Sequence, residues 1–310
     1  MQGALIIDKP EGWTSHDVVG KVRRLAGTRR VGHTGTLDPF ATGVLVVCVG
    51  AATRLSQLLV GCDKEYLATI RLGWATDTQD GTGERVGEPA ASELIPDDAA
   101  LIRRVLSEFS GEQDQLPPMY SAKKVGGRAL YKHARAGREI ERKPVRVRAE
   151  MRLADEHFEV NDQLVRNEDG SVDVRMWVVC SAGTYVRTLA HDVGVRLGCG
   201  AHLATLRRTR VGRFSIDDAV TLEALEGHVA ERIVPPADLV AELPVVRLDD
   251  AGEALARHGM PLPGVDVELG DGDPVALVDA GGALVGIARF DAETGVLKPR
   301  IILPGEPNPL

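Results

Sequence analysis

The sequence predicts a mixed α/β fold in which a large domain is followed by a small, β-rich domain. Segments with helical apolar spacing alternate with apolar or alternating segments of strand length, and a proline-rich break precedes a stretch rich in glycine and valine. The chain has 310 residues, 44% apolar and 26% charged, which is an ordinary globular composition. We therefore expect one domain at residues 1–240 and a second at 241–310.

The N-terminal segment contains the first three predicted elements. Residues 5–8 have the apolar character of a short strand. A helix is expected between Ser15, its capping residue, and Gly27, because its apolar residues fall on one face: Val18, Val19, Val22 and Leu25. Residues 43–50 form a continuous apolar run, which is typical of a strand buried on both faces.

The central segments alternate between the two periodicities. Strands are expected at residues 66–73, 143–160 and 171–181, and helices at 97–109 and 185–197.

The C-terminal part is set apart by prolines. The chain breaks at Pro235-Pro236 and again at Pro244, and residues 245–303 then contain short apolar runs separated by glycines. This pattern predicts a small β domain.

The sequence has no recognisable signal peptide, membrane-spanning segment or cysteine motif for metal binding. The start, Met1 to Lys9, has no basic segment before its short apolar run, and no apolar stretch approaches the roughly 20 residues that a membrane helix needs. We therefore expect a cytoplasmic protein with no membrane partner. The four cysteines are scattered without a C-x-x-C pair, so we expect them to be buried apolar residues and not metal ligands: Cys48, Cys62, Cys180 and Cys199.

Charge is unevenly distributed along the chain. The formal net charge is −8, but residues 236–310 hold 13 acids and five bases, so the excess acid lies in the tail. A basic segment at 123–152 holds three acids and these bases: Lys123, Lys124, Arg128, Lys132, Arg135, Arg138, Arg142, Lys143, Arg146, Arg148 and Arg152. Composition alone leaves a nucleic-acid contact and an ordinary solvated face about equally open.

The segment most informative for chemistry is residues 32–43, which packs glycines, a histidine and one carboxylate between a helix and a buried strand. Pro39 favours an extended Asp38, so the loop is able to present that carboxylate rigidly. An ordinary Asp-Pro turn is the favoured reading if the loop is considered alone. A buried carboxylate needs a counter-charge, and Arg187 at the start of a predicted helix is the most conspicuous base. The alternative is a surface arginine in the first turn of a helix, where the macrodipole disfavours it.

Several motifs together resemble the TruB family of tRNA pseudouridine synthases. The loop Gly32 to Pro39 matches the family signature, and five further segments agree with the family order over about residues 3–220. They are Asp8-Lys9-Pro10 with Gly12 and Thr14-Ser15, Lys64-Glu65-Tyr66, Pro117 to Val125, Gly183 to Leu189, and Leu206 to Arg210 with Gly212 and Phe214. The resemblance implies a pseudouridine-synthase-like catalytic domain on a mixed, largely antiparallel sheet with flanking helices, and a PUA-like C-terminal domain.

The resemblance also implies roles for individual residues. Asp38 falls at the indispensable aspartate, Arg187 at its arginine partner, and Tyr66 at the tyrosine that stacks on the uracil and helps to remove the C5 proton. Leu206 matches an apolar residue packing on the base, and His33 a histidine that enters the T loop. Lys9, Tyr185 and Lys64 lie in motifs assigned to substrate binding. An insertion at about 118–146 is expected to close over RNA, with these backbone contacts: Lys123, Lys124, Arg142 and Lys143.

The implied reaction converts the uridine at tRNA position 55, in the T loop, to pseudouridine, with tRNA as the partner, no metal and no cofactor. We expect a monomer. Two other functions fit one carboxylate and a flipped base: a non-catalytic tRNA-folding chaperone and a nucleic-acid glycosylase.

Overall fold

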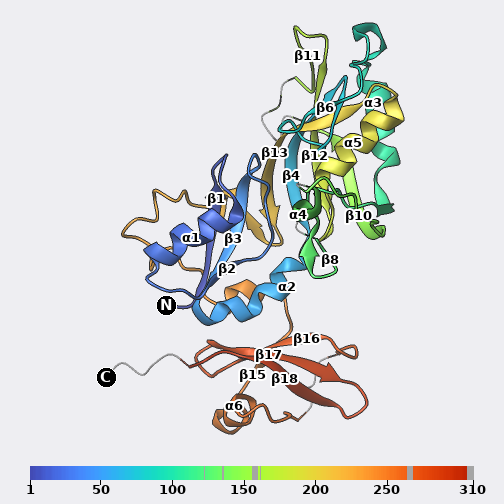
Figure 1. Cartoon of the computed structure of the whole chain (residues 1–310). Helices are drawn as coiled ribbons and strands as arrows, with labels where there is room; N and C mark the ends of the chain where they lie inside the picture. Colours follow the sequence, from blue (N-terminus) through green and yellow to red (C-terminus); the bar gives the residue numbers. More distant parts are fainter. Residues whose placement is uncertain (122, 135, 156–159, 161, 264–267, 306–310) are drawn as a thin grey trace.

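The computed structural model describes residues 1–121, 123–134, 136–155, 160, 162–263 and 268–305. Figure 1 shows a large mixed α/β body with a small second sheet beneath it. The body therefore corresponds to the predicted catalytic part, and the small sheet to the predicted β domain.

Within the described residues, ten strands form the large sheet, whose path runs β1-β3-β13-β4-β12-β10-β7, with β2, β11 and β14 at its margins. Every pairing is antiparallel except that of β13 with β3, so the prediction of a mixed, largely antiparallel sheet is confirmed. The strands are β1 Gly3–Lys9, β2 Val31–His33, β3 Thr42–Val49, β4 Lys64–Leu72, β7 Gly111–Gln115, β10 Val145–Leu153, β11 Leu164–Arg166, β12 Val172–Cys180, β13 Ala201–Val211 and β14 Phe214–Ser215.

Helices cover the sheet in two places. Helices α3 (Ala99–Glu108) and α5 (Val186–Leu197) pack on β4, β12 and β10, and together they bury one apolar core. Helix α1 (Ser15–Leu25) packs on one face of β1 and β3, whose opposite face contacts α2 (Ser56–Val60) and the C-terminal sheet. The run 43–50 is therefore buried on both faces, as predicted.

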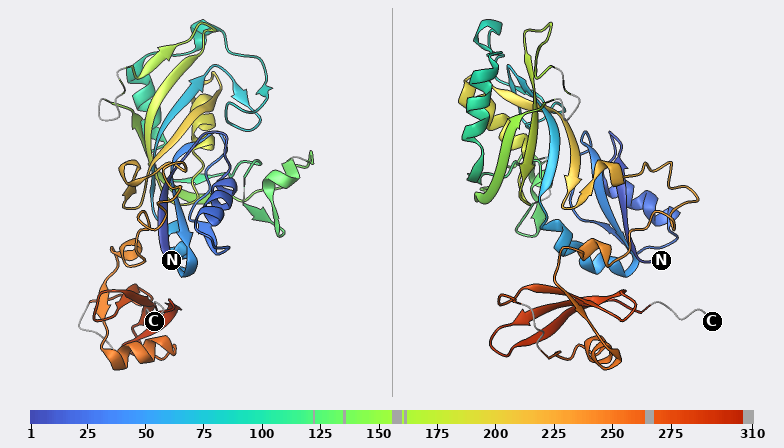
Figure 2. Two further views of the ribbon diagram at one scale, coloured as in Figure 1. Left: turned by 90° about the vertical axis from the view of Figure 1, so that its left-hand side faces the viewer. Right: turned by 180° about the vertical axis from the view of Figure 1, so that it is seen from behind.

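Several short elements lie between the main strands and helices. They are the hairpins β5 (Ala75–Thr76) with β6 (Arg85–Val86) and β8 (Lys124–Val125) with β9 (Arg128–Ala129), helix α4 (Leu130–Ala134), and 3-10 turns at Gly50–Leu55, Ser92–Leu94, Ile216–Asp218 and Asp238–Val240. Figure 2 shows β8, β9 and α4 projecting from the side of the body, within the predicted insertion 118–146.

Two predicted boundaries are wrong. Thr14, and not Ser15, caps α1, because Thr14 and Asp17 form a reciprocal capping box. Ser15 lies inside the first turn, and its hydroxyl accepts from Leu37 N at 2.8 Å. The strand predicted over 143–160 covers only Val145–Leu153; residues 156–159 lie outside the described part of the chain.

The C-terminal sheet has the order β15-β16-β17-β18, with β15 Val245–Arg247, β16 Pro274–Val278, β17 Leu284–Asp291 and β18 Val296–Ile302. Helix α6 (Asp250–Arg257), which the sequence reading missed, lies near β17 and β18 and buries Ala256 in their core. The other face of the sheet shares a core with β1 and β3, in which Ile287 packs in one cluster with Ile6 and Val44. The small domain therefore packs against the large one on the face of β1 and β3 that lies opposite α1.

No helix in the described ranges is long and apolar enough to cross a membrane. Cys48, Cys180 and Cys199 are buried and Cys62 is half-buried, all as free thiols.

Candidate active site

A pocket of about 240 Å³ lies where the loop before β3 meets the start of β4, the end of β12, the middle of β13 and the start of α5. This volume is below the roughly 300 to 1,000 Å³ of typical drug-sized sites, so it suits one nucleobase. Its lining is Thr34, Gly35, Thr36, Leu37, Asp38, Val60, Lys64, Tyr66, Ser121, Cys180, Ser181, Gly183, Thr184, Tyr185, Val186, Arg187, Leu206 and Arg208.

The loop that presents Asp38 is anchored to the N-terminal segment. Ser15 hydrogen-bonds both the N–H and the carbonyl of Leu37, and Gly12 N donates to Pro39 O at 2.8 Å. Because hydrogen bonds hold the backbone of the residue on each side of Asp38, the position of the Asp38 backbone is fixed. Two sequence motifs that are separate along the chain, at residues 9–15 and 32–39, are thus in direct contact.

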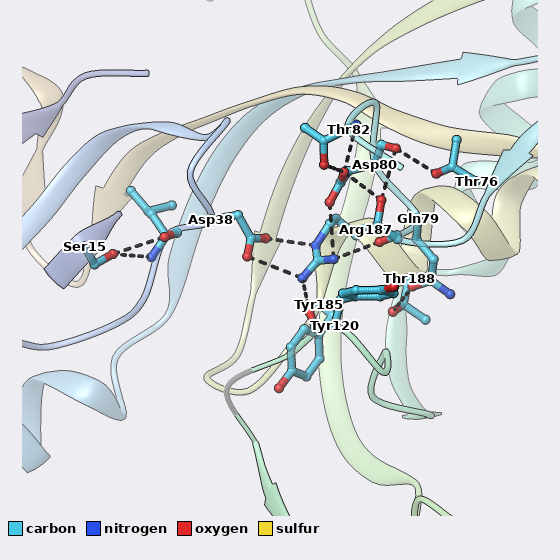
Figure 3. Close-up of polar contacts among 12 residues, drawn as sticks. Ser15, Asp38, Thr76, Gln79, Asp80, Thr82, Tyr120, Tyr185, Arg187 and Thr188 are labelled. Carbon is cyan, nitrogen blue, oxygen red and sulfur yellow. Dashed lines mark hydrogen bonds and ion pairs between the residues drawn. The ribbon is translucent and has the colours of Figure 1, made fainter. Parts of the chain in front are cut away.

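Arg187 binds Asp38 through a buried guanidinium (Figure 3). Its Nε lies 2.8 Å from Asp38 Oδ2 and its Nη2 3.4 Å from Asp38 Oδ1. Its Nη1 and Nη2 also donate to the carbonyls of Thr78 and Tyr120, each at 2.8 Å, and Nη1 lies 3.3 Å from Asp80 Oδ2. The side chain is 4% exposed, against 35% for Asp38, so the pair is open to the pocket only from the carboxylate side.

Asp80 is the second carboxylate of this cluster, and sequence reasoning missed it. Its Oδ1 accepts from the Thr78 hydroxyl at 2.8 Å, from Thr82 N at 3.0 Å and from the Thr82 hydroxyl at 2.5 Å. Gln79, which precedes it, has a φ of 65°, and its amide oxygen accepts from the Thr188 hydroxyl at 2.8 Å. This turn therefore fixes Asp80 and, through it, the far end of the Arg187 guanidinium.

Opposing charges set the ionisation of Asp38. Burial raises the pKa of its carboxyl above the ordinary value, the charge of Arg187 lowers that pKa, and the charge of Asp80 raises it again. The net direction is upward, because desolvation is the largest of these effects. Asp38 is thus less acidic than a surface aspartate although it has an arginine partner.

Tyr66 and Leu206 bring apolar surface to the pocket from neighbouring strands. They are 8% and 7% exposed, and Leu206 pairs with Ala68, two residues along β4 from Tyr66. Burial raises the pKa of the Tyr66 phenol to about 12, so the phenol is protonated at neutral pH. The two side chains are suited to hold a flat base.

Lys64 and Tyr185, which are predicted to bind substrate, also line the pocket. The Lys64 ammonium donates to the carbonyls of Val60 and Cys62, each at 2.6 Å, and burial lowers its pKa. Tyr185 is held by Gln115, whose side chain bonds both the N–H and the carbonyl of Tyr185 at 2.8 and 3.0 Å. Burial raises the pKa of the Tyr185 phenol.

Lys9 and His33 lie outside the pocket lining. Lys9 is fully buried, and its ammonium donates to the carbonyls of Pro10, Trp13 and Pro39 at 2.6 to 3.2 Å. Lys9, which is predicted to bind substrate, therefore turns inward and supports the Asp38 loop. His33 is half-buried, its Nδ1 accepts from Gly35 N at 3.3 Å, and burial lowers its pKa.

Lys123, Arg142 and Lys143, which are predicted to contact the RNA backbone, belong to the insertion and are not among the residues that line the pocket. Lys143 is exposed and Lys123 half-buried, whereas Lys124 is described only as part of the backbone of β8. Arg142 donates to Pro117 O at 3.1 Å and pairs with Glu139. Three bases of β10 are also paired: Arg146 with Glu112, Arg148 with Asp63, and Arg152 with Asp155. The cluster is thus less free than its composition suggests.

Arg208 is a second residue that sequence reasoning did not assign to the site. It is 2% exposed and lines the pocket, and its guanidinium donates to Val44 O at 2.6 Å and Gly35 O at 3.1 Å. Gly43 opposes it on β3, where a Cβ would lie 2.2 Å from Arg208 O, so only glycine fits there. The alternation of a strand, which puts residues 206 and 208 on one face, was the available signal.

Comparisons with known proteins identify the family of the chain. The sequence profile of the TruB family pseudouridylate synthase N-terminal domain matches residues 23–186, and that of the tRNA pseudouridylate synthase B C-terminal domain matches residues 187–239. The chain is similar to the tRNA pseudouridine synthase B of Leifsonia xyli subsp. xyli, with 44% identity over 93% of this chain and 92% of the relative. Its identity to the tRNA pseudouridine synthase B of Symbiobacterium thermophilum is 49%, over 84% of this chain and 83% of the relative.

Among solved structures, a chain in the structure of an H/ACA RNP bound to a substrate RNA containing 2'-deoxyuridine superposes with a TM-score of 0.70. The two chains are 26% identical, and the superposition covers 98% of this chain and 86% of the other. Because the two family profiles cover residues 23–239 and the Leifsonia xyli relative is 44% identical over 93% of this chain, the chain belongs to the TruB family of pseudouridylate synthases.

Proposed function

We propose that the protein isomerises uridine at tRNA position 55, in the T loop, to pseudouridine, with Asp38 as the catalytic carboxylate. The observation that carries the proposal is the Asp38–Arg187 ion pair at a base-sized pocket lined by Tyr66 and Leu206. Family membership supplies the reaction class, because the matching relatives are tRNA pseudouridine synthases.

The steps of uridine isomerisation require side chains of the kinds that line the pocket. The N1–C1' bond of uridine breaks, the uracil turns, and C5 bonds to C1' while the C5 proton leaves and N1 gains a proton. A uracil in a folded loop must first leave its stack, which costs a few kcal/mol, and must then be held between apolar or aromatic side chains. Tyr66 and Leu206 provide such surfaces, and Asp38 lies at the same pocket. Attack on C1', attack on the ring and elimination to a glycal all begin from this arrangement.

One experiment separates this function from its alternatives. Unmodified tRNA carrying tritium at uracil C5 is incubated with the protein. An isomerase releases tritium to water while the base stays bonded to the sugar, a glycosylase releases free uracil, and a folding chaperone releases neither. Free uracil, or intact labelled uridine after full incubation, would overturn the proposal.

We also propose that the insertion binds the T stem. Replacing Lys123, Lys124, Arg142 and Lys143 with glutamine should weaken tRNA binding and flatten the salt dependence of affinity, because each neutralised phosphate contributes about 0.7 to 0.9 to the slope of log affinity against log salt. Filter binding across a salt series measures the slope. A charge-matched control removes four exposed arginines elsewhere: Arg103, Arg104, Arg196 and Arg232. Equal slopes in the two variants would show that the insertion is only a solvated face.

A pH profile tests the electrostatic role of Asp80. If ionised Asp38 is the reactive form, activity is lost as the pH falls through the pKa of Asp38. Because the charge of Asp80 raises that pKa, Asp80→Asn should move the acid limb of the single-turnover rate to lower pH. Asp77→Asn removes a neighbouring exposed carboxylate and should leave the limb in place. An upward shift in Asp80→Asn would contradict the prediction.

The C-terminal residues 241–310 are proposed to form a PUA-like domain on a catalytic domain of residues 1–240, in a monomeric protein. With five bases against 13 acids, residues 236–310 are poorly suited to phosphate binding, so their proposed role is to stabilise the back of the large sheet through the shared core.

A further inference from the structure

Two buried cations face the pocket without an anionic partner. Arg208 is 2% exposed and Lys64 7% exposed, and both line the pocket. Among the residues that the structure describes, neither forms an ion pair with a carboxylate; Asp38 and Asp80 both pair with Arg187. The groups that they hydrogen-bond are neutral: two carbonyls for Lys64, and two carbonyls and the Tyr66 hydroxyl for Arg208.

This arrangement is expensive for a purely structural purpose. A charged group taken out of water is strongly penalised unless an opposite charge compensates it, whereas a neutral amide would satisfy the same carbonyls. The two charges also repel each other, and burial together with the charge of Arg208 lowers the pKa of Lys64. Lys64 and Arg208 therefore give this side of the pocket a positive charge that no carboxylate of the described residues neutralises.

An anion that compensates the two cations would lie in the same pocket as the nucleobase. Tyr66, Leu206, Lys64 and Arg208 line the same pocket of about 240 Å³, and β13 places Arg208 two residues after Leu206, in register with Tyr66 on β4. The phosphates of the RNA backbone have other cations available, because the insertion carries exposed bases such as Arg138 and Lys143. A uracil held in the pocket by Tyr66 and Leu206 would lie beside Lys64 and Arg208, which line the same space.

We propose that Arg208 and Lys64 stabilise the negative charge that develops on the uracil as its bond to the ribose breaks. The inference rests on the proposed function. When N1–C1' breaks heterolytically, both electrons stay with the base, whose charge spreads over N1 and the carbonyl oxygens, while C1' is left electron-poor. Fixed cations in a dry pocket stabilise such a charge more in the transition state than in the neutral substrate.

The test compares two leaving groups. Fluorine at C5 makes the uracil anion more stable, so cleavage of 5-fluorouridine depends less on the enzyme's cations. Single-turnover loss of the N1-linked nucleoside is measured for tRNA carrying uridine or 5-fluorouridine at the target position, with enzyme above the measured Kd of each variant. Nuclease digestion and chromatography quantify the nucleoside.

We expect Arg208→Gln to slow the uridine reaction by about a hundredfold and to raise the ratio of the 5-fluorouridine rate to the uridine rate by about tenfold. Lys64→Gln should move both quantities in the same direction. Arg208→Lys, which keeps the charge, should restore the wild-type ratio. The matched control is Arg207→Gln: Arg207 is the adjacent residue of β13, pairs with Asp8 and is absent from the pocket lining, so its ratio should equal that of the wild type.

Each other outcome overturns the inference. A slower Arg208→Gln or Lys64→Gln variant with an unchanged ratio would assign these side chains to packing, and weaker tRNA binding with an unchanged ratio would assign them to a phosphate. If Arg208→Gln does not fold, Lys64→Gln decides by the same ratio. Inactive wild-type protein would instead refute the proposed function, so the two failures are distinguishable.

Discussion

Asp38→Asn is expected to bind tRNA and to form no detectable pseudouridine. Asparagine keeps the size of the side chain and can still accept a hydrogen bond from Arg187, but it cannot act as a nucleophile or accept a proton as a carboxylate does. The loop should hold its position, because Ser15 and Gly12 bind the backbone on both sides of residue 38. Tritium release from C5-labelled tRNA measures turnover, and filter binding measures affinity.

A surface carboxylate near the site provides the control. Asp63 pairs with Arg148 and is absent from the pocket lining, so Asp63→Asn should keep wild-type turnover. Retention of even a few per cent of turnover by Asp38→Asn, with a normal melting temperature, would remove Asp38 from the catalytic role.

The elements of this fold could be predicted where periodicity and burial coincide. The run 43–50 was readable as a doubly buried strand because α1 packs on one of its faces and α2 and the C-terminal sheet on the other. Helix α5 was readable because Val186, Leu189 and Val193 face one core. Helix α6 was missed because it spans only Asp250–Arg257 and buries only Ala256 fully, so its segment is shorter than the windows in which a helical apolar pattern is recognised.

The site was predictable only in part, because its second layer depends on contacts between distant segments. Asp38 and Arg187, 149 residues apart, were paired from motif resemblance and the need for a counter-charge. Asp80 lies in a turn rich in threonine and aspartate that looks like any surface loop, and only the fold directs its carboxylate at Arg187. The inward turn of Lys9 was not predictable for the same reason, since no sequence pattern shows which way a lysine at a strand end points.

Local charge was the least reliable guide. Five consecutive positions, Leu206 to Arg210, hold four basic or hydroxyl side chains with different fates. Arg207 and Arg210 pair with Asp8 and Glu65, whereas Arg208 is buried against carbonyls. A count of bases along the chain does not distinguish paired from unpaired charges, because pairing is decided across strands.

Arg187→Met is expected to reduce turnover by several orders of magnitude and to destabilise the protein. The substitution removes five hydrogen-bond or ionic contacts and leaves Asp38 and Asp80 as like charges without the cation between them. Breaking a buried ion pair by removing one partner typically costs about 3 to 5 kcal/mol. The pKa of Asp38, already raised by burial, should rise further, because the lost charge was lowering it.

Three measurements on matched variants check this expectation. Arg187→Lys keeps the charge but has no planar fork, so it should retain part of the activity and more of the stability than Arg187→Met. Arg196→Met removes an arginine of the same helix that is 53% exposed and pairs with Glu108, and it should leave turnover unchanged. Thermal melting, single-turnover rates and the acid limb of the pH profile are compared. The limb should move to higher pH in Arg187→Met, because a carboxylate without its cation is protonated more readily. An Arg187→Met variant that is within tenfold of wild-type turnover, or whose acid limb does not move, would show that Asp38 does not depend on this arginine.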